Sequence, residues 1–165
     1  MLVRLGKLEY AIEPGQLFWL PFDCLCATTQ LPNSVVHEIS ISVRINAKFT
    51  KQAGYIADVP LLLSLIDKLS SASANQEHTD ALLKVVKFEC MTLKPELTLS
   101  PLSETISQWA PNKPLTEKEI HLGLLVREAR KMKLSGRKDD DIANQLFAGQ
   151  VEQFHALYHT LVAQD

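Results

Sequence analysis

The segment DDDIANQLFAGQVEQFHALYHTLVAQD, residues 139–165, carries the clearest structural pattern of the chain. Its three leading aspartates suit the positive N-terminal end of a helix. The tripeptide Ala148-Gly149-Gln150 can form a tight turn. A second helix should follow, because apolar residues recur at helical spacing at Val151, Phe154, Tyr158 and Leu161. The pattern predicts a helix-turn-helix unit, although helical hairpins that bind no DNA follow the same pattern.

A longer helix is expected immediately upstream. In the segment LTEKEI, residues 115–120, Thr116 and Glu119 fit a capping box with a flanking hydrophobic staple. The helix can continue to about Leu134, and Gly136 is well placed to end it. Its inward face would consist of Leu122, Leu125, Val126, Ala129 and Met132.

The front of the chain has the period of β-strands. In residues 35–45, apolar side chains occupy every second position, which predicts a half-buried antiparallel strand with His37 on its apolar face. Two shorter strands are expected on either side of the turn Glu13-Pro14-Gly15. In the first of these, Leu8, Tyr10 and Ile12 alternate with Lys7, Glu9 and Ala11, and the second covers Gln16 to Leu20.

After Val59 the apolar period lengthens to that of helices. One amphipathic helix follows Pro60, a second extends to Leu93, and the polar residues 70–76 separate them as a hairpin. Ser100-Pro101 can begin a short third helix that reaches Trp109. The expected fold is therefore α+β, with three consecutive domains: a β-rich module at 1–58, a helical region at 59–110 and a helix-turn-helix domain at 111–165.

The composition is that of a soluble globular protein. The chain has 165 residues, 46% of them hydrophobic, and its net charge of -2 provides no overall attraction to nucleic acid or to an acidic membrane. No apolar run is long enough to span a bilayer, and charges interrupt residues 1–16, so no signal peptide is expected. Cys24 and Cys26 are expected on opposite faces of a strand, which argues against a disulfide framework. These features predict a cytoplasmic protein.

Positive charge is concentrated just before the helix-turn-helix. Residues 118–138 contain seven Lys and Arg side chains, whereas residues 139–165 contain five acids and no base. Any phosphate contacts should therefore come from the upstream helix and loop, while glutamines of the last helix could contact adenine edges. The candidate DNA-binding residues are Arg127, Arg130, Lys131, Lys133, Arg137, Lys138, Gln150 and Gln153.

The C-terminal spacing resembles the linker helix and second helix-turn-helix of AraC/XylS-type transcription regulators. Arg127 and Ala129 precede the pair Ile142-Ala143, and two aromatics, Phe154 and Tyr158, follow at the family's spacing. The family's Gly-Phe pair after the isoleucine is replaced by Phe147-Ala148, with Gly149 displaced beyond it, so we expect a reshaped turn. The resemblance implies transcription regulation through DNA binding.

A second resemblance lies at the front of the chain. Gly15, five residues and Pro21 are similar to the second motif of cupin barrels, and residues 6–9 are similar to the end of the first. A cupin-like module implies a small-molecule effector. The helical hairpin falls where such regulators dimerise, which implies a homodimer through Leu62, Leu65, Leu69, Leu82, Val86 and Leu93.

The chain departs from the family pattern at two places. The cupin-like module would begin almost in its middle, since only a few residues precede Gly6. Residues 93–115 are too few for a first helix-turn-helix of family type. The sequence is therefore similar to an AraC-type regulator shortened twice, with one divergent helix-turn-helix.

No enzyme, metal or cofactor site is expected. His121, His155 and His159 have no suitable nucleophile nearby in the sequence, and the last two lack a third zinc ligand. A cupin metal histidine would fall where Cys26 stands. The sequence thus predicts an AraC-like DNA-binding regulator. The alternative is a dimeric interaction protein that binds no DNA and modulates a full-length regulator.

Overall fold

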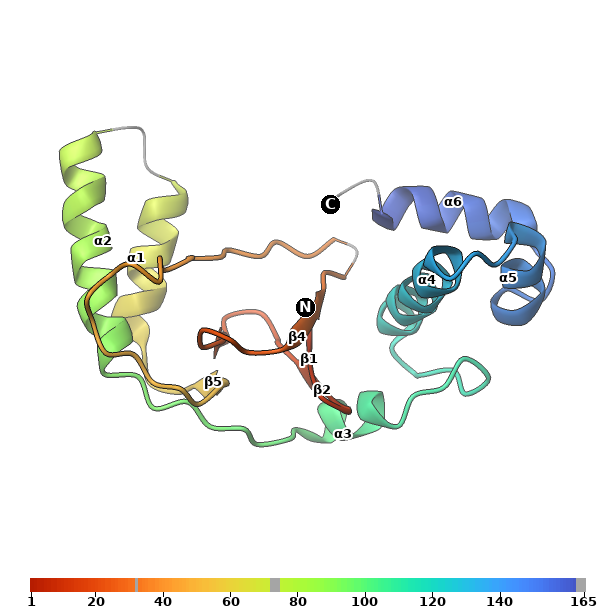
Figure 1. Ribbon diagram of the computed structural model, residues 1–165, viewed down its shortest axis with the longest axis horizontal. Coiled ribbons are helices and arrows are strands. Elements are labelled where there is room, and N and C mark those ends of the chain that lie inside the picture. Colours follow the sequence, from red (N-terminus) through yellow and green to blue (C-terminus); the bar gives the residue numbers. More distant parts are fainter. Residues whose placement is uncertain (32, 72–74, 163–165) are drawn as a thin grey trace. The chain divides into compact units, whose positions relative to one another are not determined.

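The structure is a computed structural model that describes residues 1–31, 33–71 and 75–162, with side chains up to residue 159. Within this part of the chain, short antiparallel strands precede six helices (Figure 1), which confirms the α+β class. The strands are β1 (Leu2–Leu5), β2 (Leu8–Ala11), β3 (Leu17–Trp19), β4 (Cys26–Thr29) and β5 (Gly54–Ile56). The helices are α1 (Pro60–Ser70), α2 (Gln76–Met91), α3 (Pro101–Ser107), α4 (Lys118–Leu134), α5 (Asp139–Leu146) and α6 (Val151–Val162). None of these helices combines the length and apolar character that a membrane crossing requires.

The chain folds into two compact units, each assembled from separate segments. Unit 1 contains Met1–Ala11, Ala27–Ser34 and Pro101–Asp165, and unit 2 contains Ile12–Cys26 and Val35–Ser100. Each unit therefore combines strands from the front of the chain with helices from further along it. The three consecutive functional domains expected from the sequence, at 1–58, 59–110 and 111–165, stay a prediction.

Unit 1 begins with a hairpin whose outer edge is covered by a short helix. The strands lie in the order β2-β1-β4, and the register of the hairpin pairs Leu2 with Ala11 and Leu5 with Leu8. Gly6, at φ 62°, provides the positive φ that the tight two-residue turn requires. On the other side of β2, the hydroxyl groups of α3 accept hydrogen bonds from the strand: Ser103 from the Ala11 amide at 3.0 Å, and Ser107 from the Glu9 amide at 2.9 Å.

The expected burial of β2 was only partly right. Tyr10, on the face expected to be apolar, is 4% exposed, but Glu9 and Ala11 on the other face are each only 5% exposed, and Leu8 is 40% exposed. Ala11 belongs to a buried cluster with Ile106 of α3 and Leu124 of α4, so the face expected in solvent is covered as well. Alternation identifies two faces of a strand, but the neighbouring elements decide whether one face or both are buried.

Helix α4 supplies residues to two buried clusters of unit 1. Ile120 and Leu124 pack with the hairpin and α3. Further along, Leu125, Ala129 and Met132 pack against α5 and α6. Because α4 packs against two clusters in different directions, apolar residues cover much of its surface.

The predicted capping box of Thr116 and Glu119 is absent, although the helix that it predicted is present. Helix α4 has Glu117 as its N-cap residue and no side-chain cap hydrogen bond. Leu115 and Ile120 both pack in the same apolar cluster, so burial fixes the start of the helix. At the other end, Gly136 adopts φ 84°, and the amide of Arg137 donates to the carbonyl of Met132 at 3.1 Å, as expected for a glycine-terminated helix.

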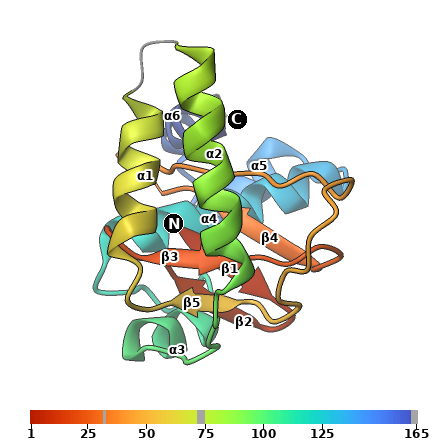
Figure 2. The ribbon, with the colours of Figure 1, turned by 90° about the vertical axis from the view of Figure 1, so that its left-hand side faces the viewer.

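Unit 2 is built around the antiparallel helices α1 and α2, which lie side by side in Figures 1 and 2. Leu62, Leu65, Val86 and Cys90 form its buried cluster, and side chains of β3 pack against that cluster. Strand β3 pairs with β5, and Tyr55 of β5 exchanges two backbone hydrogen bonds of 2.9 Å with Glu96. Gly54 is needed here, because a Cβ on it would lie 2.5 Å from the Glu96 backbone.

The strand predicted at residues 35–45 is absent, because this segment has irregular backbone. Ile39 and Ile41 pack against the unit 2 core, but Val35 and Val43 are 83% and 75% exposed. His37, which was expected on a buried face, is exposed. A strand needs a hydrogen-bonded neighbour as well as an alternating pattern, and β3 and β5 pair with each other instead.

Candidate functional site

Helices α5 and α6 are joined by a tight turn, and both pack on α4. Ile142, Ala143 and Phe154, three of the residues that carry the resemblance to AraC-type regulators, have exposed fractions of 0%. The ring of Phe154 lies 5.2 Å from that of Phe147 and 5.5 Å from that of Tyr158, measured between centroids. These residues hold the two helices together, so their first role is structural.

The turn between α5 and α6 is closed by backbone hydrogen bonds. The amides of Phe147 and Gly149 both donate to the carbonyl of Ala143, at 2.8 and 2.9 Å. Ala148 and Gly149 have φ values of 50° and 81°. Ala148 thus occupies a left-handed conformation that a Cβ disfavours, which is the local cost of an alanine at this position.

The outward surface of α6 is polar, and residues 151–162 contain no Lys or Arg. It presents Glu152, Gln153, His155 and His159, all of them exposed. Gln150, in the turn, is exposed as well. The structure therefore presents both candidate base-contacting glutamines to solvent.

The candidate phosphate-contacting residues lie in several environments. Arg130, Lys131, Lys133, Arg137 and Lys138 are exposed, whereas Arg127 is half-buried. The ammonium of Lys131 lies 3.2 Å from the carboxylate of Glu128, one turn away. Arg137 and Lys138 belong to the loop between α4 and α5, where their exposed side chains can reach a bound polyanion.

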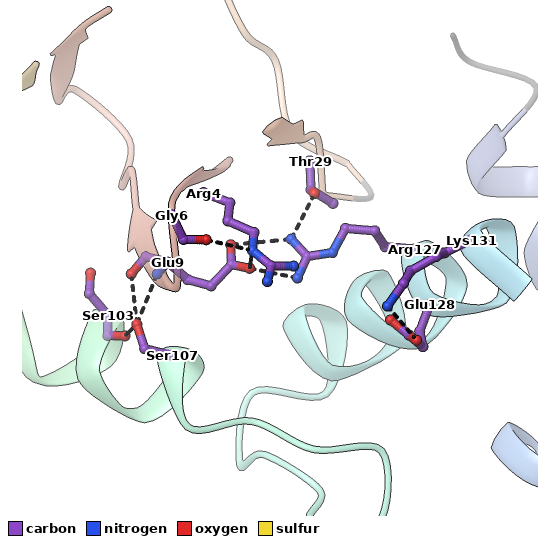
Figure 3. A network of polar contacts seen from close by, with 9 residues as sticks. All are labelled: Arg4, Gly6, Glu9, Thr29, Ser103, Ser107, Arg127, Glu128 and Lys131. Carbon is purple, nitrogen blue, oxygen red and sulfur yellow. Dashed lines mark hydrogen bonds and ion pairs between the residues drawn. The ribbon is translucent and has the colours of Figure 1, made fainter. Parts of the chain in front are cut away.

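Arg127 holds a buried carboxylate (Figure 3). Its guanidinium forms a two-pronged ion pair with Glu9, with Nη2 to Oε1 at 2.6 Å and Nη1 to Oε2 at 3.2 Å. Nη1 also donates to the hydroxyl of Thr29 at 3.3 Å. The side chain of Glu9 is 7% exposed and that of Arg127 is 26% exposed. This geometry satisfies both charges, so the arginine links α4 to the sheet.

Sequence reasoning missed this ion pair because it placed Glu9 on the solvent face of β2. A carboxylate with apolar neighbours on both sides of it in the chain was the available signal, since a buried charge requires a partner. The partner lies 118 positions away in the sequence, and no local pattern identifies it.

A second polar cluster joins α4, α5 and α6. The Asp139 carboxylate lies 3.2 Å from the Lys133 ammonium and 3.0 Å from His155 Nε2. The same ammonium lies 4.8 Å from the centroid of the Tyr158 ring. Burial by itself would raise the pKa of Asp139, but hydrogen bonds and positive charge from Lys133 and His155 lower it below the ordinary value. The cluster neutralises Lys133 locally.

The predicted dimerisation residues lie within the core of unit 2. Leu62, Leu65 and Val86 are 5%, 8% and 2% exposed, and the partly buried Leu69, Leu82 and Leu93 pack on the same cluster. They hold α1 against α2 in one chain. A different stripe of α2 is exposed and apolar: Ala81, Val85, Phe88 and Met91. Phe88 is 62% exposed, and Val85 and Met91 are each 40% exposed.

Unit 2 also contains an open hollow of about 640 Å³ beside β5 and the C-terminal end of α2. Asp58, Glu89 and Glu96 line it together with one basic side chain, Lys94. Its size is in the range of small-molecule sites.

The histidines that were weighed as catalytic residues make structural contacts. Trp109 Nε1 donates to His121 Nδ1 at 2.9 Å, and burial lowers the pKa of His121. His155 contacts Asp139, as described above. Among the described residues, no three His, Cys, Asp or Glu side chains gather closely enough to hold a metal ion.

Comparisons of the chain with protein-family models, with curated proteins and with solved structures found no match. The resemblance to AraC-type regulators therefore depends on the residues quoted in the sequence analysis.

Proposed function

We propose that this chain is an AraC-like transcription regulator that binds DNA through α5 and α6. One observation carries the proposal: α5, a tight turn and α6 close around Phe154, and the exposed face of α6 is polar. A helix presented in this way has the dimensions to enter the major groove. The spacing of Ile142, Phe154 and Tyr158 supports the same assignment.

The proposed contacts differ from the full set of basic residues predicted from the sequence. Arg137 and Lys138, in the exposed loop before α5, would contact phosphates, and Gln150 and Gln153 would contact base edges. Arg130 would add a phosphate contact from the exposed surface of α4. Arg127 supports the site indirectly, because its guanidinium is engaged by Glu9.

A single copy would bind weakly. Each phosphate contact contributes a salt-dependence slope of about -0.9 in log K against log salt, so two or three contacts give little affinity at physiological salt. We therefore propose a homodimer that places two helix-turn-helix units on DNA. Because the sequence-predicted leucines lie inside unit 2, the dimer would form through the exposed stripe of Val85, Phe88 and Met91.

The DNA proposal is tested by fluorescence anisotropy on a pool of labelled genomic fragments, at low and at physiological salt. The double variant Arg137→Ala/Lys138→Ala should reduce the salt slope by about two for each bound copy. The matched control is Arg44→Ala/Lys51→Ala, which removes two exposed positive charges from unit 2. A wild type that binds at neither salt, or an equal loss in both double variants, would contradict the proposal.

The effector expected for such a regulator would bind in the hollow of unit 2. Three carboxylates against one lysine favour a cationic small molecule. A thermal-shift series comparing amines with carboxylates of the same size tests this, and stabilisation by the carboxylates alone would contradict it.

A second candidate function is a dimeric interaction protein that modulates a full-length regulator without contacting DNA. The pairing of Lys131 with Glu128 and of Lys133 with Asp139 favours it, because these carboxylates reduce the positive potential beside α6. The DNA-binding assay separates the two functions, and light scattering with Phe88→Glu as the disrupting variant tests the dimer that both require. A dimer that Phe88→Glu dissociates, together with no DNA binding, would support this second candidate.

A further inference from the structure

Helix α6 has no permanent positive charge, but it carries two exposed histidines. His155 and His159 lie one helical turn apart on the same side of the helix, and the centroids of their rings are 6.4 Å apart. Histidine is the side chain whose charge ordinarily changes between about pH 5 and about pH 8. On this helix, only these two side chains can become positively charged in that range.

The first of them, His155, belongs to a cluster of charged side chains. Its Nε2 lies 3.0 Å from the carboxylate of Asp139, at the start of α5, and the same carboxylate lies 3.2 Å from the ammonium of Lys133 on α4. The charges of Asp139 and Lys133 cancel while His155 is neutral. Proton uptake by His155 therefore leaves the cluster with an excess of positive charge.

The contact with Asp139 decides which nitrogen takes up the proton. A carboxylate only accepts hydrogen bonds, so Nε2 of His155 carries the hydrogen and Nδ1 is the nitrogen that becomes protonated. The side chain of His155 is 46% exposed, so a bound molecule can reach it. Burial alone would raise the pKa of Asp139, but hydrogen bonds and positive charge from Lys133 and His155 lower it. Asp139 thus stays ionised while histidines gain protons.

The surroundings of His159 are simpler. Its ring lies 6.4 Å from that of Tyr158, at an angle of 87° between the planes. It forms no ion pair with another side chain in the described part of the protein. Glu152, one turn before His155, is the acidic side chain on the exposed surface of α6. Two protonated histidines would outweigh this single acid.

We propose that His155 and His159 are DNA contacts of α6 that act in their protonated form, so that acid strengthens DNA binding. This inference rests on the proposed DNA-binding function and adds a way in which it is regulated. The partner is the phosphate backbone of DNA, because phosphates are the negative charges that such a helix meets.

The chemistry of the two protonation states explains the expected response. A protonated imidazole donates hydrogen bonds from both nitrogens, and its bonds to phosphate oxygens are charge-assisted. It also releases counterions from DNA, which a neutral ring does not. Arg137 and Lys138 stay charged throughout this pH range, so they would supply the part of the binding that does not depend on pH.

The test repeats the anisotropy titrations on labelled genomic fragments at about pH 8 and about pH 6, each over a series of salt concentrations. At the lower pH we expect tighter binding and a salt slope that is steeper by up to about two for each bound copy. Circular dichroism at both pH values verifies that the protein stays folded.

Three double variants make the result specific. His155→Gln/His159→Gln should bind as the wild type does at the higher pH and should lose the gain at the lower one. The matched control His37→Gln/His78→Gln removes two exposed histidines of unit 2 and should keep the gain. His155→Lys/His159→Lys should show the steep salt slope at both pH values.

The outcomes distinguish this inference from the function on which it rests. Wild-type protein that binds DNA equally well at both pH values would overturn the inference and leave DNA binding in place. A gain that survives in His155→Gln/His159→Gln, or that both glutamine pairs lose equally, would do the same. Wild-type protein that binds at neither pH would overturn the proposed function as well.

Discussion

Helices α2 and α6 both bury one apolar stripe, but the surface that α6 presents to solvent is polar, whereas that of α2 is apolar. The outward side of α6 carries Gln153, His155 and other polar groups, whereas that of α2 carries Val85, Phe88 and Met91. Each helix buries its apolar stripe in the core of its own unit, through Phe154 in α6 and Val86 in α2. The surface left over therefore indicates the kind of partner: a polar one for α6 and an apolar one for α2.

The largest expected effect compares one phenylalanine from each helix. Phe154→Ala should lower the free energy of unfolding by about 3–5 kcal/mol, because the ring is fully buried. Phe88→Ala should change it by no more than about 0.5–1 kcal/mol, since that ring is 62% exposed. Urea unfolding followed by circular dichroism measures both, and similar losses in the two variants would break the comparison.

The next effect concerns the ion pair that fixes α4 to the sheet. Glu9→Gln should cost about 1–3 kcal/mol, because it leaves the half-buried guanidinium of Arg127 without its counter-charge. Glu128→Gln is the matched control at an exposed pair with Lys131, and it should cost less than about 0.5 kcal/mol. The same urea titration applies, and equal costs would mean that burial of Glu9 does not strengthen its pairing.

A smaller effect of opposite sign is expected at the turn of the helix-turn-helix. Ala148→Gly should stabilise the protein by up to about 1 kcal/mol, because φ 50° is unfavourable for a residue with a Cβ. The same replacement within α6, Ala156→Gly, should destabilise by about 1 kcal/mol. Thermal unfolding of the two variants should therefore shift in opposite directions, and a destabilised Ala148→Gly would contradict this account of the turn.

The smallest effect is a pH dependence from His121. Burial lowers its pKa, so its contribution to stability is complete above the ordinary value of 6.5 and is lost as the pH falls through 6.5 towards the folded-state pKa. Asparagine can accept the same hydrogen bond from Trp109 without taking up a proton. His121→Asn should thus flatten the stability profile between about pH 8 and about pH 5. His159→Asn, at an exposed site, serves as control, and an unchanged profile in His121→Asn would refute the assignment.

The helices were predictable because local residues mark them. Pro60 starts α1, the aspartates start α5, and Gly136 follows the end of α4, as their conformational preferences require. The helical stripe of the last helix also identified Phe154, which is fully buried, as an inward-facing residue. These features depend on residues that are close together in the chain, so a single sequence is enough to recognise them.

The β region was harder to predict, because its strands depend on distant partners. Residues 35–45 have the pattern of a strand but no pairing neighbour, whereas β1 was missed. Glu9 was expected in solvent because α3 and α4, which cover its face of β2, come about a hundred residues later. At the candidate site, the ion pair between Arg127 and Glu9 was not predicted for the same reason, because the two residues are far apart in the sequence.

The two serine hydroxyl groups of α3 have a consequence for self-association. Ser103 and Ser107 occupy the amides of Ala11 and Glu9, which an incoming strand would otherwise use. An open strand edge is a template for the growth of aggregates, and covering it with a helix blocks that route. The short helix α3 thus protects β2 from sheet extension, and it does so with two side chains spaced one helical turn apart.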